Sequence, residues 1–109
     1  MNNKNYMTKK IYEEKGGIRF GDSFWLSSNY SWPFANIEIF KDKIILSWGY
    51  SKIVYNKKDI RYIEKYRGLF SKGIRIKYNK KKNWKFIIFW SPSVDNLLSK
   101  LKKGGYKIK

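Results

Sequence analysis

Ten basic side chains between residues 61 and 85 are the residues of this sequence best suited to hold another molecule. Clustered lysines and arginines bind phosphate groups, which gives salt-sensitive affinity for nucleic acid, and they also attract anionic membrane leaflets. Charge on the outer face of a sheet is also common without a partner, and lysines protect exposed strand edges. We predict an anionic-partner surface here, with a merely solvated face as the alternative. Its residues are Arg61, Lys65, Arg67, Lys72, Arg75, Lys77, Lys80, Lys81, Lys82 and Lys85.

Leu69 and Phe70 occupy a glycine-flanked connection between Arg67 and Lys72 and form a candidate apolar loop tip. If this pair enters the headgroup layer of a membrane while the two cations contact lipid phosphates, apolar burial and electrostatics act together. The alternative is that the connection folds back and plugs one end of the sheet. We favour the alternative, because loops often cover such ends and isolated exposed apolar residues are common.

Four aromatic residues, Trp25, Tyr30, Trp32 and Phe34, lie before and inside what we expect to be the first long connection. Proteins that bind single-stranded nucleic acid stack bases on such rings beside basic side chains. Tryptophan and phenylalanine more often serve as core or rim packing, and the spacing here is not specific. Base stacking therefore stays a secondary hypothesis.

Residue types that carry most catalytic chemistry are missing. The sequence has no histidine and no cysteine, and its eight carboxylates are scattered without the spacing of a metal loop or an acid-base pair. Gly16-Gly17 and Gly104-Gly105 lack the flanking pattern of phosphate-binding loops. We predict a protein that is not an enzyme and uses neither a cofactor nor a metal.

The charge is large and unevenly distributed. The formal net charge is +17, and residues 41–109 carry twenty basic against four acidic side chains, whereas residues 1–40 carry five and four. Such a surface attracts polyanions, although AT-rich coding alone also favours lysine. The polar N-terminus leads into no apolar stretch of signal-peptide length, and the longest apolar run, Phe86–Trp90, is far too short to span a bilayer. We expect a cytoplasmic protein, with peripheral membrane contact as an option.

Short runs of β-branched and aromatic residues, separated by Gly, Asn, Asp and Lys clusters, predict a mainly β chain. Phe40–Ile44 is typical of a tight hairpin turn and Asn79–Asn83 of a longer one, which favours antiparallel neighbours. The seven predicted strands are Ile18–Ser28, Asn36–Lys41, Lys43–Trp48, Lys52–Asn56, Ile60–Arg67, Gly73–Asn79 and Lys85–Trp90.

After Trp90 the period changes to that of a helix, predicted over about residues 92–103 with one apolar stripe. Ser91 can cap its first N–H groups, Pro92 suits the first helical position, and Gly104 can take a left-handed C-cap. No linker divides the chain, so we expect one domain over residues 16–109, preceded by a loose or weakly helical lead-in over residues 1–15.

Several segments within this order of elements resemble small bacterial proteins of PH-like (pleckstrin-homology-like) or GRAM-like type. They are Pro33–Ile39, Asp59-Ile60 with Ile63-Glu64, Gly73–Ile76, Ile87–Trp90 and the helix around Leu97-Leu98. The resemblance implies a PH-like seven-stranded antiparallel β-sandwich or barrel, capped by one C-terminal helix. It transfers no activity, because it consists mostly of core positions. Residues 29–34 have no lysine or arginine, unlike the first hairpin of phosphoinositide-binding PH domains.

The expected function is that of a non-catalytic, strongly basic interaction module. Its partner would be an acidic protein or an anionic membrane surface. The alternative is a nucleic-acid-binding protein that uses the basic strands and the aromatic side chains. A third possibility is a scaffold or an oligomer subunit that uses an uncovered strand edge.

Overall fold

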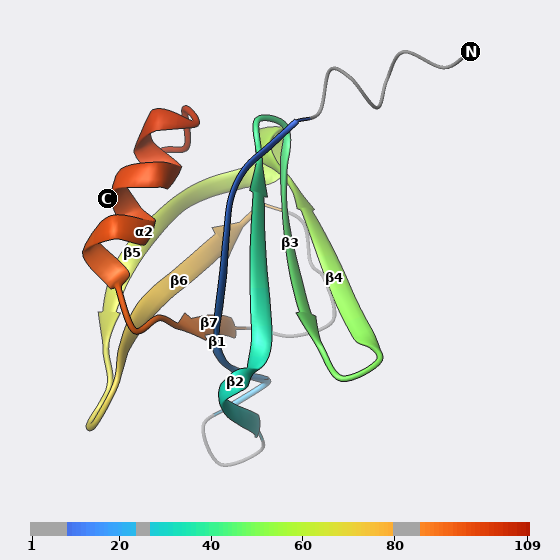
Figure 1. The fold of residues 1–109 in the computed structure, drawn as a ribbon, viewed down its shortest axis with the longest axis vertical. Coiled ribbons are helices and arrows are strands. Elements are labelled where there is room, and N and C mark those ends of the chain that lie inside the picture. The colour runs from blue at the N-terminus through green and yellow to red at the C-terminus, as the bar shows by residue number, and fades with distance from the viewer. Residues whose placement is uncertain (1–8, 24–26, 80–85) are drawn as a thin grey trace.

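Seven antiparallel strands form one continuous sheet, and an α-helix follows them (Figure 1). The structure is a computed structural model and describes residues 9–23, 27–79 and 86–109. A 3-10 turn, η1 (Lys57–Asp59), joins β4 to β5, and helix α2 spans Val94–Lys103. The strands are β1 (Lys10–Gly21), β2 (Ser27–Phe40), β3 (Lys43–Trp48), β4 (Ser51–Asn56), β5 (Ile60–Arg67), β6 (Lys72–Tyr78) and β7 (Phe86–Trp90). The predicted mainly β chain with seven strands and a terminal helix is confirmed.

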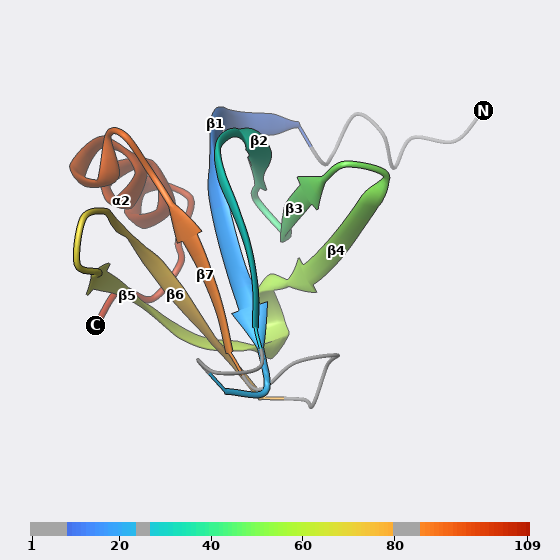
Figure 2. The same cartoon turned by 90° about the horizontal axis from the view of Figure 1, so that it is seen from below.

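The sheet is curled into a half-barrel, which Figure 2 shows from below. Its strand order is β4-β3-β2-β1-β7-β6-β5, so β4 and β5 are the two edges although they follow each other in the chain. The short η1 crosses from one edge to the other, and the phenol rings of Tyr55 and Tyr78 meet edge to face at 4.8 Å across the interior. This crossing brings the edges close enough to enclose one core.

Alternation along the strands puts apolar side chains on the inner side of the sheet. In β6, Ile74 and Ile76 are buried, while Arg75 and Lys77, which alternate with them, point to the outer face and stay half-buried. The predicted apolar and basic faces of this strand are therefore confirmed. The side chains of β7 alternate in direction in the same way, but both faces of this strand are apolar, and Ile88 is buried on the outer face opposite Arg75.

Helix α2 covers the inner side of the sheet near β1 and β6. Its apolar stripe, Val94, Leu97 and Leu101, is buried in the same core as the strands, as the helical spacing predicted. Lys100, Lys102 and Lys103 in the last turn complement the C-terminal end of the helix dipole.

The predicted ends of α2 are displaced by one or two residues. The N-cap is Ser93 and not Ser91, and Pro92 precedes the helix. Gly104 caps the C-terminus in right-handed conformation, whereas Gly105 has the left-handed φ of 87°. The Ser91 hydroxyl lies just before the helix, where it accepts from the Ser93 N–H at 3.1 Å and donates to Glu14 of β1.

The first strand begins earlier than the sequence predicted. Residues 10–16 pair with residues 35–40 of β2, so the expected loose lead-in is wrong from Lys10 onward. The predicted strand Ile18–Ser28 is likewise the end of β1, its connection and the start of β2, and residues 29–34 belong to β2. This part of β1 has three consecutive charged residues, Glu13, Glu14 and Lys15, and only its pairing with β2 shows that it is a strand. Residues 1–8 lie outside the described part of the chain.

The C-terminal residues close the end of the half-barrel at which the β2–β3 turn lies, which is the upper end in Figure 1. Ile63 of the β5 edge exchanges backbone hydrogen bonds of 2.8 Å with Lys107 and Lys109, as one parallel bridge. The buried Tyr106 donates its phenol O–H to the carbonyl of Phe40 at 2.6 Å, and the Lys57 ammonium donates to the carbonyl of Gly104 at 2.6 Å. These contacts tie the chain after α2 to the β2–β3 turn, to η1 and to β5.

None of the helical residues that the structure describes forms a segment long and apolar enough to cross a membrane.

Candidate functional site: an aromatic groove at an apolar end

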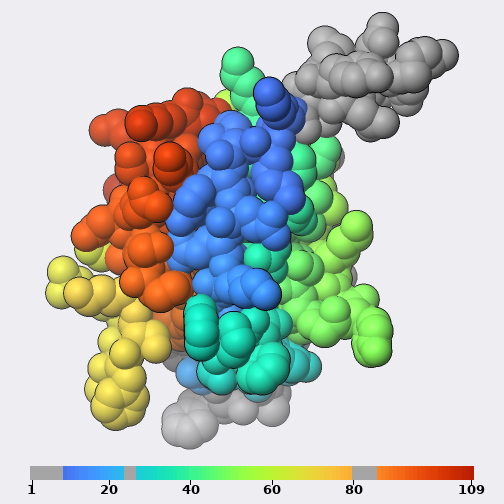
Figure 3. All heavy atoms as spheres, in the orientation of Figure 1, coloured from blue at the N-terminus to red at the C-terminus, as the bar shows by residue number. Residues whose placement is uncertain are grey.

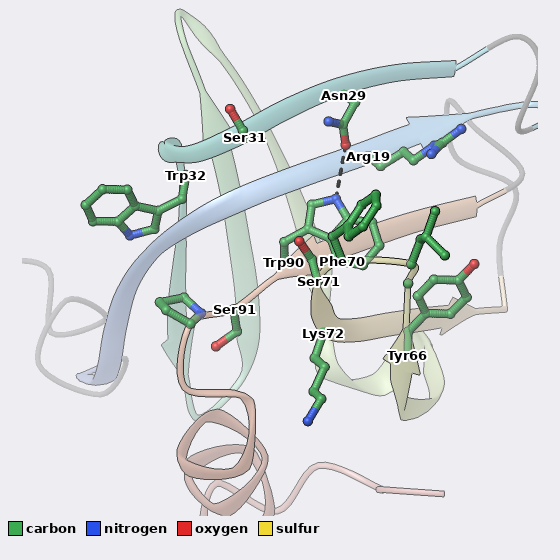
Figure 4. Close-up of a pocket in the computed structure, with 13 residues that line it drawn as sticks. Arg19, Asn29, Ser31, Trp32, Tyr66, Phe70, Ser71, Lys72, Trp90 and Ser91 are labelled. Atoms are coloured by element: carbon green, nitrogen blue, oxygen red, sulfur yellow. Dashed lines mark hydrogen bonds between the residues drawn. The ribbon is translucent and has the colours of Figure 1, made fainter.

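An open groove of about 710 Å³ lies on the outer face of the sheet (Figure 4). It runs between β1 and β2 on one side and the β5–β6 hairpin on the other, with the end of β7 as its floor. We call it the aromatic groove. Its lining residues are Arg19, Asn29, Ser31, Trp32, Tyr66, Gly68, Leu69, Phe70, Ser71, Lys72, Trp90, Ser91 and Pro92.

The floor of the aromatic groove is a tryptophan held from two sides. The indole Nε1–H of Trp90 donates to Asn29 Oδ1 at 3.0 Å, and its ring lies 5.8 Å from the Tyr66 ring centroid. Gly68 leaves room for this ring, since a Cβ there would lie 2.8 Å from it. The half-buried Trp90 ring is therefore held in one position, because its N–H group is hydrogen-bonded and the Tyr66 ring packs beside it.

The β5–β6 hairpin forms one wall. Arg67 pairs with Lys72 at the strand ends, and the Gly68 N–H donates to the Ser71 carbonyl at 2.7 Å. Leu69 and Phe70 at the turn are 89% and 93% exposed. The expectation that this connection folds back to plug the sheet is therefore wrong, because the tight turn directs both side chains to solvent.

An irregularity in β2 forms the opposite wall. Gly16 pairs with Ala35 and Ile18 with Tyr30, so residues 31–34 have no register partners on β1 and bulge outward. Gly17 permits this, since a Cβ there would lie 2.6 Å from the Tyr30 carbonyl oxygen. The bulge leaves Trp32 61% exposed at the edge of the groove. The sequence placed Tyr30, Trp32 and Phe34 in a connection; Trp25 lies outside the described residues.

Exposed apolar side chains gather at one end of the molecule. Of the seven large hydrophobic side chains that are exposed in the described residues, six lie in three segments: residues 27–34, the β3–β4 turn and the β5–β6 turn. Figures 1 and 3 show these segments, in teal, green and yellow, toward the lower end of the view. We call this set the apolar end; it consists of Tyr30, Trp32, Phe34, Tyr50, Leu69 and Phe70.

The sheet divides the predicted basic surface. On β5 and β6, Glu64 pairs with Arg75, and Lys65 pairs with the buried Ile74. Opposite residues of antiparallel strands point to the same side, so Lys65 faces away from Arg75. The Lys65 ammonium instead donates to Asp95 Oδ1 of α2 at 3.0 Å. The sequence predicted the strands but not their register, which decides which charges share a face.

The remaining predicted cations are distributed over several places. Arg61 is exposed beside the Tyr62 ring at a β5 bulge, and Lys77 shares the outer face with Arg75. The Arg75 Nε atom is buried and has no hydrogen-bond partner among the described residues. Arg67 and Lys72 flank the hairpin tip. Lys80, Lys81, Lys82 and Lys85 lie outside the described residues, as does the predicted turn at Asn79–Asn83 beyond Asn79.

A hydrogen-bonded cluster around Glu14 joins β1 to the start of α2, and the sequence did not indicate it. Glu14 accepts from the hydroxyls of Ser91, of Ser93 at 3.0 Å and of Tyr12 at 2.6 Å. Partial burial and the hydrogen bond to Glu14 raise the pKa of Tyr12. The bonded groups are distant in sequence and only the fold brings them together. Because these side chains are hydrogen-bonded to one another, the cluster connects β1 to the start of α2, and we call it the Glu14 joint.

The described residues contain no group of three or more side chains suited to hold a metal ion. Comparison of the chain with protein-family models, with curated proteins and with solved structures finds no match. The function must therefore be argued from the aromatic groove, the apolar end and the charge.

Proposed function

We propose that this protein is a PH-like, non-catalytic module that binds anionic membrane surfaces through its apolar end. The order of elements, seven antiparallel strands and then one helix, supports the PH-like assignment. The observation that carries the membrane proposal is the β5–β6 hairpin tip, where exposed Leu69 and Phe70 project between Arg67 and Lys72. Of the partners that a charge of +17 attracts, only a membrane can also bury these side chains without a matching pocket.

Magnitudes explain why both kinds of residue are needed. Burying one leucine or phenylalanine side chain is worth about 1.5–3 kcal/mol, and each cation near an anionic leaflet adds about 1 kcal/mol. Leu69 and Phe70 alone would give reversible and marginal binding, comparable to one short lipid chain. Arg67, Lys72 and the exposed Lys52 beside the β3–β4 turn raise the affinity only where the leaflet is negative. The protein would therefore discriminate between anionic and neutral membranes.

Sedimentation with vesicles tests this proposal. The protein should bind vesicles with 30% phosphatidylglycerol in phosphatidylcholine at physiological salt, and should remain in solution with phosphatidylcholine alone. The double variant Leu69→Ser/Phe70→Ser should lose at least about tenfold in binding. Its matched control is Ile11→Ser, because Ile11 is the one exposed large hydrophobic among the described residues outside the apolar end. Equal binding of the double variant and the native chain would refute the role of the tip.

Charge is tested in the same assay. Arg67→Glu/Lys72→Glu should abolish binding, whereas Lys102→Glu/Lys103→Glu, an equal change of charge at the end of α2, should weaken it only slightly. An equal loss in both variants would show that only net charge matters. Binding of oligonucleotides but not vesicles would identify a nucleic-acid-binding protein, and binding of neither would favour an acidic protein partner.

A further inference from the structure

The aromatic groove has the chemistry of a site for an amphiphilic anion. Its walls are apolar and aromatic, its cations are Arg19 and Lys72, and no aspartate or glutamate is among its described lining residues. Figure 4 shows Trp90 and Phe70 in the middle and Trp32 at one side, while the charged ends of Arg19 and Lys72 point away from the middle at the periphery. A ligand that matches this arrangement has an apolar body in the middle and a negative group at the edge.

The position of the groove relative to the hairpin tip specifies the ligand further. Leu69 and Phe70 form both the exposed tip and one wall of the groove, so the two sites are continuous. When the tip enters the boundary between headgroups and acyl chains, the groove lies beside it at the depth of the lipid phosphates. Tryptophan and tyrosine, which supply Trp32, Trp90 and Tyr66 here, are the side chains that prefer this depth.

The groove is also formed before any ligand arrives. The Trp90 indole is fixed by Asn29 and by the Tyr66 ring, and the turn under Phe70 is closed by a backbone hydrogen bond. Its volume of about 710 Å³ lies in the range of small-molecule sites, between about 300 and 1,000 Å³. It can take the phosphate, the glycerol and the first chain carbons of one lipid.

A nucleic acid fits the groove less well. Asn29, the one carboxamide in the lining, accepts from Trp90, and this hydrogen bond holds it against the floor of the groove. The exposed aliphatic Leu69 offers a base no stacking surface, whereas it suits an acyl chain.

We infer that the aromatic groove binds one anionic phospholipid in a 1:1 complex, with its chains against Trp32, Leu69 and Phe70 and its phosphodiester at the rim, where the exposed Lys72 side chain turns toward it on binding. This inference rests on the proposed membrane function, to which it adds a stoichiometric site. The charged leaflet would attract the protein to the membrane, and the groove would then bind an individual lipid molecule.

Titration with a short-chain lipid below its micelle concentration tests the inference without a membrane. Dihexanoyl phosphatidylglycerol should shift the tryptophan fluorescence saturably with a stoichiometry of one. Dihexanoyl phosphatidylcholine should bind at least about tenfold more weakly, and glycerol phosphate, which has the anion without chains, should not bind. Saturable binding of glycerol phosphate would identify a free-phosphate site, and displacement of the lipid by a short oligothymidylate would identify a nucleic-acid site; either result overturns the inference.

Variants locate the site. Trp32→Ala and Lys72→Gln should each weaken binding of the short-chain lipid at least about fivefold. Both side chains are exposed, and circular dichroism should show unchanged melting. Tyr50→Ala is the matched control, since Tyr50 belongs to the apolar end but not to the groove lining, and it should bind the short-chain lipid normally. Equal binding by all three variants would refute the groove.

The two proposals fail in different ways. Vesicle binding without binding of the monomeric lipid would leave the membrane function standing and remove the groove site. Failure to bind either form of lipid would remove both proposals.

Discussion

The two ends of the half-barrel treat their aromatic and apolar side chains in opposite ways. At the upper end, the chain after α2 folds back, buries Tyr106 and joins the β5 edge. At the apolar end, residues 27–34 of β2 and the β3–β4 and β5–β6 turns leave six large hydrophobic side chains exposed. The same chain therefore buries an aromatic ring at one end and leaves aromatic rings exposed at the other. The difference supports the proposal that the upper end serves stability and the apolar end serves contact with a partner.

The largest effect on folding should come from the upper end. Tyr106→Ala removes a buried ring and the hydrogen bond to Phe40, so we expect a loss of about 3–5 kcal/mol in the free energy of unfolding. Tyr106→Phe keeps the ring and should cost only about 1 kcal/mol. Urea denaturation measures both. A loss below about 1 kcal/mol for Tyr106→Ala would contradict the structural role of this end.

The same measurement on the apolar end should give almost no loss. Leu69→Ser/Phe70→Ser should change the free energy of unfolding by less than about 0.5 kcal/mol, because both side chains are almost fully exposed. The variant should nevertheless lose vesicle binding at least about tenfold. A destabilisation above about 2 kcal/mol would show that these residues pack in the folded protein, and would remove the contrast between the ends.

The Glu14 joint should have an intermediate effect. Glu14→Gln keeps the size of the side chain but weakens three hydrogen bonds, of which those from Ser91 and Ser93 connect β1 to the β7–α2 connection. Hydrogen bonds to a charged group are worth more than neutral ones, and we expect a loss of about 1–3 kcal/mol. Vesicle binding should be unchanged. Glu13→Gln, a neighbouring exposed carboxylate, is the control and should cost less.

The smallest effect concerns alkaline stability. Burial, with a contribution from Tyr78, raises the pKa of Tyr55 far above its ordinary value near 10, and burial does the same to Tyr106. Above about pH 10 the unfolded chain releases these protons and the folded chain keeps them, so stability is full below pH 10 and falls as the pH rises. Tyr55→Phe should make that fall less steep. Urea midpoints at pH 8 and pH 11 measure it, and an unchanged slope would contradict the assignment.

Local sequence signals predicted most of the strands and the helix, but they did not predict which residues of neighbouring strands pair. The helical stripe of Val94, Leu97 and Leu101 and the alternation around Ile74 and Ile76 follow from spacing alone, and the structure confirms both. The polar start of β1 carries no such signal, since its pairing with β2 is what makes it a strand. The predicted basic surface was divided for the same reason, because a shift of one residue in register moves a side chain to the other face.

The sequence by itself determined a mainly β chain with a C-terminal helix, a strong positive charge, and the absence of the residue types that most catalysis requires. These properties depend on composition and on short-range periodicity. Only the tertiary structure decided that Leu69 and Phe70 are exposed, that Trp32 and Trp90 border one groove, and that Glu14 supports the helix. Each of these depends on contacts between residues distant in the chain. Strand register and sheet curvature determine those contacts, and short stretches of sequence do not predict them.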